Sequence, residues 1–196
     1  MTSWTYWFHL AALTATVAAY WPMRRADAGS MGEFHRQGTA EAVAAWLNAH
    51  EAGLPALREL LSADMRFLFC YPLLFVSMAA LSGSSSSVIP TAISAAAAGV
   101  ADYIETSKGL SILNGGSPDQ AAAMAKASIW KWRLFGVASL ASAYALYPSA
   151  GFTGHRAIAC AIAVLFLGLC VLSSGTKPAI AGLSFFAAAV TMAVAR

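Results

Sequence analysis

The sequence contains little charge and many apolar residues. Charged residues make up 11% of its 196 residues, against roughly 25% in an average soluble domain. Hydrophobic residues make up 59%. The basic residues form no cluster of the kind that nucleic-acid binding needs, so we expect no nucleic-acid partner. This composition predicts a polytopic membrane protein that has the lipid bilayer as its first partner.

Cysteine pairs, a secretory signal and catalytic motifs are also missing. Cys70, Cys160 and Cys170 lie in apolar runs without a C-x-x-C pair, which is typical of small buried hydrophobic residues. No basic segment precedes the first apolar run, so we interpret it as a retained span. No Gly-rich phosphate loop, H-E-x-x-H motif or arrangement of serine, histidine and acid is present. No catalytic residue is therefore assigned, and an enzyme is not favoured.

Six apolar segments are each close to the roughly 17–25 residues that a membrane helix needs. We therefore predict an all-α integral membrane protein, with a single membrane domain that forms a bundle of about six transmembrane helices. The predicted spans are residues 3–22, 62–82, 88–108, 125–147, 157–174 and 178–195.

The segment between the first two spans, residues 23–61, is predicted to lie in the cytoplasm. Its first part, Met23 to Gly38, is polar and rich in glycine, which indicates a loop. Thr39 precedes a short capped helix whose apolar stripe favours an interfacial position on the cytoplasmic face. Pro72, well inside the second span, predicts a kink.

The distribution of basic residues predicts the orientation. With the N-terminus outside, ten lysines and arginines lie on the cytoplasmic side or its interface, and only Arg156 and Arg196 lie outside. This arrangement obeys the positive-inside rule. Both termini are therefore predicted to lie outside.

The histidines show no ligand pattern. His9 lies inside the first span and could ligate a haem, a chlorophyll or a metal. No second ligand pairs with it at helical spacing, so a packed or interfacial histidine is favoured. His35 and His50 lie in the polar segment without metal-ligand spacing, and we expect both to be solvated. No cofactor is specifically implied.

The third span carries charges into the membrane. Val88 to Ala101 are fourteen residues without a charge, and as a helix they cover roughly 21 Å of a hydrocarbon core about 30 Å thick. Asp102 then lies roughly 9 Å, and Glu105 roughly 5 Å, inside the near boundary. Ionised groups at that depth need a partner, water or a ligand.

The fourth span offers the complementary charge. Its apolar run after Arg133 is also only fourteen residues long, so the span must begin earlier, which draws Lys131 and Arg133 into the cytoplasmic leaflet. Asp64 falls at the cytoplasmic boundary of the second span, with Tyr71 two turns above it. The candidate ligand or charge-cluster residues are Asp64, Tyr71, Asp102, Glu105, Lys108, Lys131 and Arg133.

These charges carry a resemblance to a group of small bacterial proteins. Asp64 precedes a span, Asp102 and Glu105 end the next, and a Lys-Trp pair at 131–132 opens the one after it. This order resembles uncharacterised four-span membrane proteins with an Asp, then Asp-x-x-Glu-Asn, then Lys-Trp, over roughly residues 62–147. Thr106 stands where that pattern has asparagine. The resemblance implies a bacterial inner membrane location and no particular activity.

Two interpretations of the cluster remain open. Its carboxylates and Lys131 can pair to fix the register of three spans, or they can form a cytoplasmic-leaflet site for a cation, an amine or a lipid headgroup. A divalent metal would usually need more oxygens than three carboxylates supply. The corresponding functions are a non-catalytic accessory or scaffold subunit of a larger membrane complex, which we favour, and a small transporter or lipid- and cation-binding protein.

Overall fold

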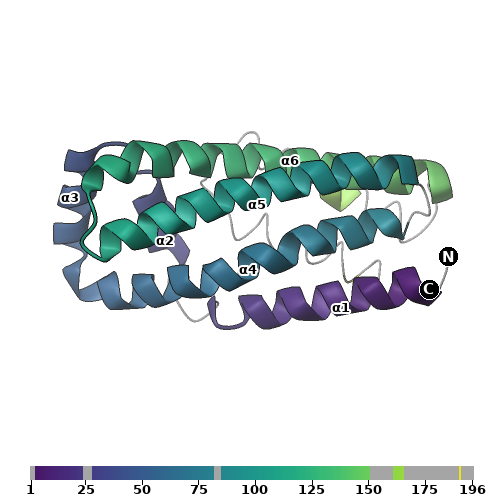
Figure 1. The fold of residues 1–196 in the computed structure, drawn as a ribbon, viewed down its shortest axis with the longest axis horizontal. Helices are drawn as coiled ribbons and strands as arrows, with labels where there is room; N and C mark the ends of the chain where they lie inside the picture. Colours follow the sequence, from purple (N-terminus) through teal and green to yellow (C-terminus); the bar gives the residue numbers. More distant parts are fainter. Residues whose placement is uncertain (1–2, 24–27, 82–84, 151–160, 166–189, 191–196) are drawn as a thin grey trace.

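The described part of the chain consists of helices joined by short turns. The computed structural model describes residues 3–23, 28–81, 85–150, 161–165 and 190, and these residues form no strand. Figure 1 shows the arrangement of the helices. They are α1 (Ser3–Tyr20), α2 (Ala28–His35), α3 (Ala40–Ala49), α4 (Leu54–Ala80), α5 (Ser85–Leu113) and α6 (Ala121–Ala150), with the single 3-10 turns η2 (Glu51–Gly53) and η3 (Pro118–Gln120).

Three long helices form the frame of the molecule. α5 packs along α6 and α4, and α1 lies along only one half of α4 (Figure 1). The short helices α2 and α3 lie near the other end of the three long helices. One half of the bundle is therefore flanked by α1, and the other half is covered by α2 and α3. We call α2, α3 and the half of the bundle that they cover the cap.

Local sequence signals explain several helix ends. The Thr39 hydroxyl accepts a hydrogen bond from the Ala42 amide at 3.2 Å, which satisfies a free donor at the start of α3. α5 ends before Gly115, whose φ of 87° is easily adopted only by glycine. The Ser117 hydroxyl then caps η3 by accepting from the Asp119 amide. The predicted capped helix after Thr39 is confirmed.

The predicted loop from Met23 to Gly38 is wrong over residues 28–35, which form α2. Phe34 and His35 at the end of this helix are buried. Gly32 and the absence of apolar periodicity gave no helical signal. So short a helix is marginal alone in water, and its stability comes from the tertiary contacts of its last residues.

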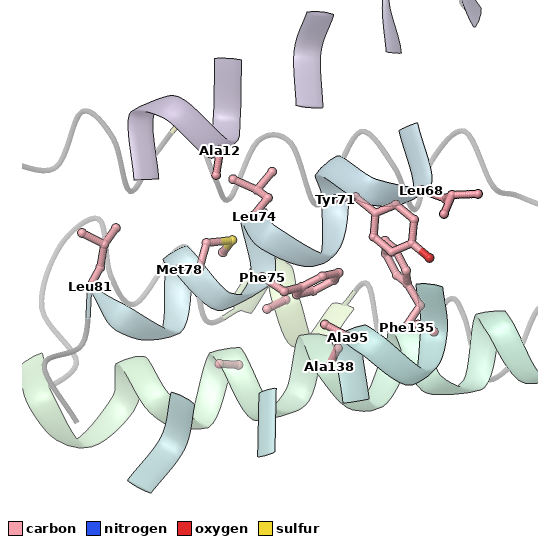
Figure 2. Close-up of a cluster of buried hydrophobic side chains, with 13 residues drawn as sticks. Ala12, Leu68, Tyr71, Leu74, Phe75, Met78, Leu81, Ala95, Phe135 and Ala138 are labelled. Atoms are coloured by element: carbon pink, nitrogen blue, oxygen red, sulfur yellow. The ribbon is translucent and has the colours of Figure 1, made fainter. Parts of the chain in front are cut away.

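Two separate apolar cores fill the interior. Figure 2 shows the first, the bundle core, where Phe75 of α4 meets Phe135 of α6 edge to face with ring centroids 4.8 Å apart. The cap core lies at the other end and joins α2, α3 and the cap-side ends of α4, α5 and α6. Its buried residues are Met23, Phe34, Val43, Trp46, Leu57, Leu60, Leu61, Ala63, Ile112, Leu113, Ala121 and Met124.

The predicted number of membrane spans is only partly reflected in the structure. One helical stretch, Glu51–Ala80, is long and apolar enough to cross a membrane by length and composition alone. α1, α5 and α6 occupy the positions of three other predicted spans, but none of them is such a candidate by the same measure among the described residues. The predicted spans 157–174 and 178–195 lie almost entirely outside the described residues. Six transmembrane helices are therefore not confirmed.

The α4–α5 contact depends on a glycine. A Cβ atom on Gly99 would lie 3.3 Å from the Pro72 ring and 3.7 Å from the Leu68 carbonyl oxygen, so α5 passes close to α4 where the proline removes a backbone donor. α4 remains helical through Pro72. The kink predicted at this residue stays a prediction.

We predict that Gly99→Leu destabilises the bundle by about 1–3 kcal/mol, because the added side chain overpacks this contact. Ala96→Leu, at an exposed position one turn away on the same helix, is the control and should cost much less. Thermal unfolding in mild detergent, followed by circular dichroism, measures both. Equal melting temperatures for the two variants would contradict close packing at Gly99.

Candidate functional site: a buried charge layer

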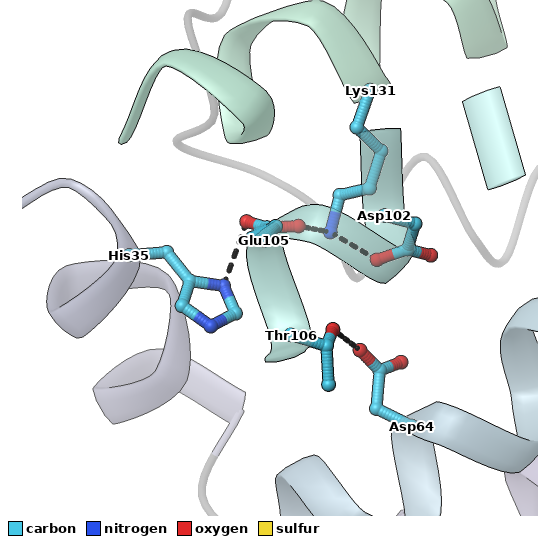
Figure 3. Close-up of polar contacts among 6 residues, drawn as sticks. All are labelled: His35, Asp64, Asp102, Glu105, Thr106 and Lys131. Carbon is cyan, nitrogen blue, oxygen red and sulfur yellow. Dashed lines mark hydrogen bonds and ion pairs between the residues drawn. The ribbon is translucent and has the colours of Figure 1, made fainter. Parts of the chain in front are cut away.

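A layer of charged side chains separates the two apolar cores. Along α4 the cap core reaches Ala63 and the bundle core begins at Leu68, and Asp64 lies between them. α5 and α6 show the same order, with core residues on either side of their charged groups. Figure 3 shows the members of this charge layer, which are His35 of α2, Asp64 of α4, Asp102, Glu105 and Thr106 of α5, and Lys131 of α6.

Lys131 is the central cation of the layer. Its ammonium Nζ donates to Asp102 Oδ1 at 3.1 Å and also forms an ion pair with Glu105 Oε2 (Figure 3). All three side chains are buried. Asp102 and Glu105 are three residues apart on α5 and so face the same side, which lets one lysine of α6 bridge both. The sequence-based pairing of these acids with Lys131 is present in the structure.

His35 extends the layer into α2. Its Nδ1 lies 2.7 Å from Glu105 Oε1, on the carboxylate oxygen that Lys131 leaves free. The expectation of a solvated His35 is wrong, because this side chain is buried. Gly109 allows the approach, since a Cβ there would lie 3.4 Å from His35 Nε2 and 3.2 Å from Phe34. α2 therefore closes over the charge layer from the cap side.

Asp64 has a weaker partner than the other acids. The Thr106 hydroxyl donates to Asp64 Oδ2 at 2.9 Å, and Asp64 forms no ion pair with a described residue. Asp64 is 4% exposed, so its carboxyl group is held in the interior by a neutral donor. Thr106, the residue that departs from the bacterial four-span pattern, is thus the one that binds Asp64.

The Tyr71 hydroxyl also belongs to this region. Tyr71 lies two turns beyond Asp64 on the same face of α4, and its hydroxyl is within reach of the charge of Asp102. The Tyr71 hydroxyl has no hydrogen-bond partner among the described residues. A buried hydroxyl in this state has lost its water without replacement, which is unfavourable.

Lys108 and Arg133 lie outside the charge layer. Arg133 is exposed, with its guanidinium 5.5 Å from the centre of the Trp130 ring. Lys108 is half-buried and makes no ion pair with a described acid. Both residues are close to the cluster in the sequence, but their side chains do not take part in the charge layer.

The other two predicted histidine positions have different surroundings. His9 is fully buried against α4, with Nδ1 2.9 Å from the Ser77 hydroxyl oxygen. Ser77 donates its own proton to the Leu74 carbonyl, so His9 Nδ1 is the donor of this contact. His50 is exposed and stacks on Trp46. Packing thus accounts for His9, whereas nothing in its described contacts indicates a cofactor.

The layer lacks the geometry of a metal site. Among the described residues, no three His, Cys, Asp or Glu side chains stand together as a bound metal ion requires. What the arrangement can do chemically is bind positive charge, hold protons and fix the relative positions of four helices.

No protein-family model, curated protein or solved structure matches this chain. The resemblance to small bacterial four-span proteins therefore stays a prediction. The residues that carry it do come together, since Asp64, Asp102, Glu105 and Lys131 form the charge layer. Trp132 packs against the adjoining bundle core.

We predict that Lys131→Met destabilises the protein by about 3–5 kcal/mol, because it leaves two buried carboxylates without their shared cation. Lys126→Met, which removes an exposed lysine from the same helix, is the matched control and should change stability little. Denaturant or thermal unfolding in detergent measures the difference.

A compensated variant separates charge from packing. Adding Asp102→Asn and Glu105→Gln to Lys131→Met removes the uncompensated charges and should recover part of the lost stability. If the triple variant is less stable than Lys131→Met alone, charge pairing is not what holds this layer.

Proposed function

We propose that this chain is an integral membrane protein that serves as a non-catalytic accessory or scaffold subunit of a larger membrane complex. The observation that carries the membrane assignment is the segregation of charge along the bundle. Residues 3–20, 67–81, 85–101 and 134–150 contain no Asp, Glu, Lys or Arg. These segments are the portions of α1, α4, α5 and α6 that surround the bundle core.

The described basic residues gather at the opposite end. Each of them lies in the cap or within about a turn of the charge layer. They are Arg36, Arg58, Arg66, Lys108, Lys126, Lys131 and Arg133. This asymmetry follows the positive-inside rule and favours a cytoplasmic cap. With that orientation, the N-terminus of α1 lies on the outer side of the membrane. The membrane that the resemblance implies is the bacterial inner membrane.

The outer surface of the charge-free half is apolar. Large side chains point away from the bundle along its helices, including Ile93 of α5 at 66% exposure and Val137 of α6 at 51%. Soluble monomers rarely leave such side chains uncovered over whole helices. Lipid chains or the helices of partner subunits would cover this surface.

The length of the charge-free half fits a bilayer. α1 has exposed Trp4 and Trp7 near its start and exposed Tyr20 and Trp21 at its end, and aromatic rings favour the two membrane interfaces. Its 18 residues rise about 27 Å, close to the roughly 30 Å of a hydrocarbon core. Tyr20 packs near Phe67, one turn along α4 from Asp64. The charge layer thus lies near the cytoplasmic interface.

The subunit role is supported by what the charged groups do. Lys131, Asp102, Glu105 and His35 contact one another and connect helices, and no catalytic arrangement was found in the sequence. A bundle that is fixed internally and apolar outside is suited to packing against other membrane proteins. α2 and α3 add a cytoplasmic surface next to the bilayer.

A second function, binding or transport of a cation, is favoured by one observation. The charge layer contains three acids and a single lysine. Loss of a substrate flux on Asp102→Asn with Glu105→Gln, with folding and assembly intact, would favour this function over the scaffold.

We predict that Ile93→Lys lowers the amount of protein recovered in the membrane fraction, because a lysine at the centre of a membrane helix costs about 2.5–3.5 kcal/mol. Ala45→Lys, at an exposed position on α3, is the added-charge control and should leave recovery unchanged. Quantitative blotting of carbonate-washed membranes provides the measurement. Wild-type recovery of Ile93→Lys would contradict burial of this helix face in lipid.

We predict that the chain, purified in mild detergent from its native membrane, retains other membrane proteins in fixed stoichiometry. Mass spectrometry of the intact complex and of everything retained, lipids and pigments included, measures this. A stable monomer that retains no protein would count against the subunit role and leave the membrane assignment intact.

A further inference from the structure

The charge layer carries an uncompensated negative charge when all its acids are ionised. Asp64, Asp102 and Glu105 face Lys131, and His35 adds positive charge only when it is protonated. The acids therefore exceed the cations in either state of His35. Arg66 of α4 and Lys108 of α5 form no ion pair with these acids. A buried excess of negative charge is costly, which favours uptake of a positive ion by the layer.

The excess is concentrated on the side of Asp64. Both Glu105 oxygens are occupied, one by His35 and the other by Lys131. By contrast, Asp102 uses only Oδ1 for Lys131, and Asp64 uses only Oδ2 for Thr106. In Figure 3 the carboxyl groups of Asp64 and Asp102 enter the charge layer from α4 and α5 without a hydrogen bond between them, and burial leaves the charge of each acting on the other. The second oxygen of each, Asp102 Oδ2 and Asp64 Oδ1, forms no ion pair with a described residue.

The orphaned Tyr71 hydroxyl is an independent observation at the same place. Tyr71 is 1% exposed, and the charges of both Asp102 and Asp64 act on its hydroxyl group. Its buried hydroxyl oxygen makes no hydrogen bond of normal geometry. A phenol at this place can donate a hydrogen bond to a neighbouring carboxyl group when the side chains adjust.

The identity of that species follows from the available ligands. Ca²⁺ takes about 6–8 oxygens, and Mg²⁺ requires nearly octahedral geometry, whereas this site offers two carboxyl oxygens and one phenol. No grouping of three metal-ligating side chains occurs among the described residues. A proton needs only two facing carboxyl groups, since like charges in one buried site cannot both remain ionised.

We propose that Asp64 and Asp102 form a buried proton-binding pair that shares one exchangeable proton, with Tyr71 as its hydrogen-bond donor. The site lies on the α4 side of the charge layer, and Lys131 balances the remaining charge from the α6 side. His35 and Glu105 of the same layer form a separate contact and do not hold this proton. The proposal adds a ligand to the layer and does not depend on the subunit role.

Infrared spectroscopy of the full chain tests the proposal directly. The protein is reconstituted into phosphatidylcholine vesicles in sodium-free buffer at neutral pH, with aspartate isotope-labelled at its side-chain carboxyl carbon. We expect the carbonyl band of a protonated carboxylic acid, and this band should shift with the label and on exchange into heavy water. Asp64→Asn and Asp102→Asn should each abolish the band, whereas Glu59→Gln at an exposed position on α4 should leave it unchanged.

A further variant keeps the test decisive if either asparagine variant fails to fold. Tyr71→Phe retains both acids and should shift the frequency of the band without removing it, because a hydrogen-bond donor is lost. Absence of a labelled acid band in the wild-type protein would overturn the proposal, as would its survival in both aspartate variants. Disappearance of the band on addition of sodium chloride would assign the site to sodium and likewise overturn the proton.

Discussion

The contact of Lys131 with Asp102 and Glu105 is the interaction on which the arrangement of the helices depends. It joins α6 to α5. Glu105 also contacts His35, and this contact joins α5 to α2. Thr106, next to Glu105, adds α4 through Asp64. Because desolvation offsets most of the attraction within a buried ion pair, the layer contributes little net stability. Its effect is to penalise every register in which these charges are not matched.

The charge layer also explains why the molecule has a cap. α2 covers the charge layer at this end of the bundle and contacts it through His35. Phe34, beside it, anchors α2 in the cap core. The charge layer thus separates the two apolar cores, and each core fills the interior of the bundle on its own side of the layer.

The sequence was sufficient to predict the acids and their lysine, because a membrane span with only fourteen apolar residues would carry Asp102 and Glu105 below the lipid surface, where they would need a partner. The same depth argument wrongly included Lys108 and Arg133, since it fixes height along a helix but not the direction of a side chain. His35 could not be found in this way. It lies in a short helix without periodicity, and only the tertiary contact at Gly109 places it beside Glu105.

The contacts of α5 in the charge layer differ between its α6 side and its α4 side, and this difference bears on both the structural and the functional interpretation. α5 and α6 are joined by charges of opposite sign, whereas the acid of α4, Asp64, is bound to α5 by a neutral hydroxyl and forms no ion pair with a described residue. If the pair lost its proton, repulsion between Asp64 and Asp102 would act across the α4–α5 contact and leave the Lys131 contacts intact. α4 is therefore the helix whose position depends on the bound proton. In the proposed membrane scaffold, one helix face would thus adjust to the proton concentration while α5 and α6 stay fixed.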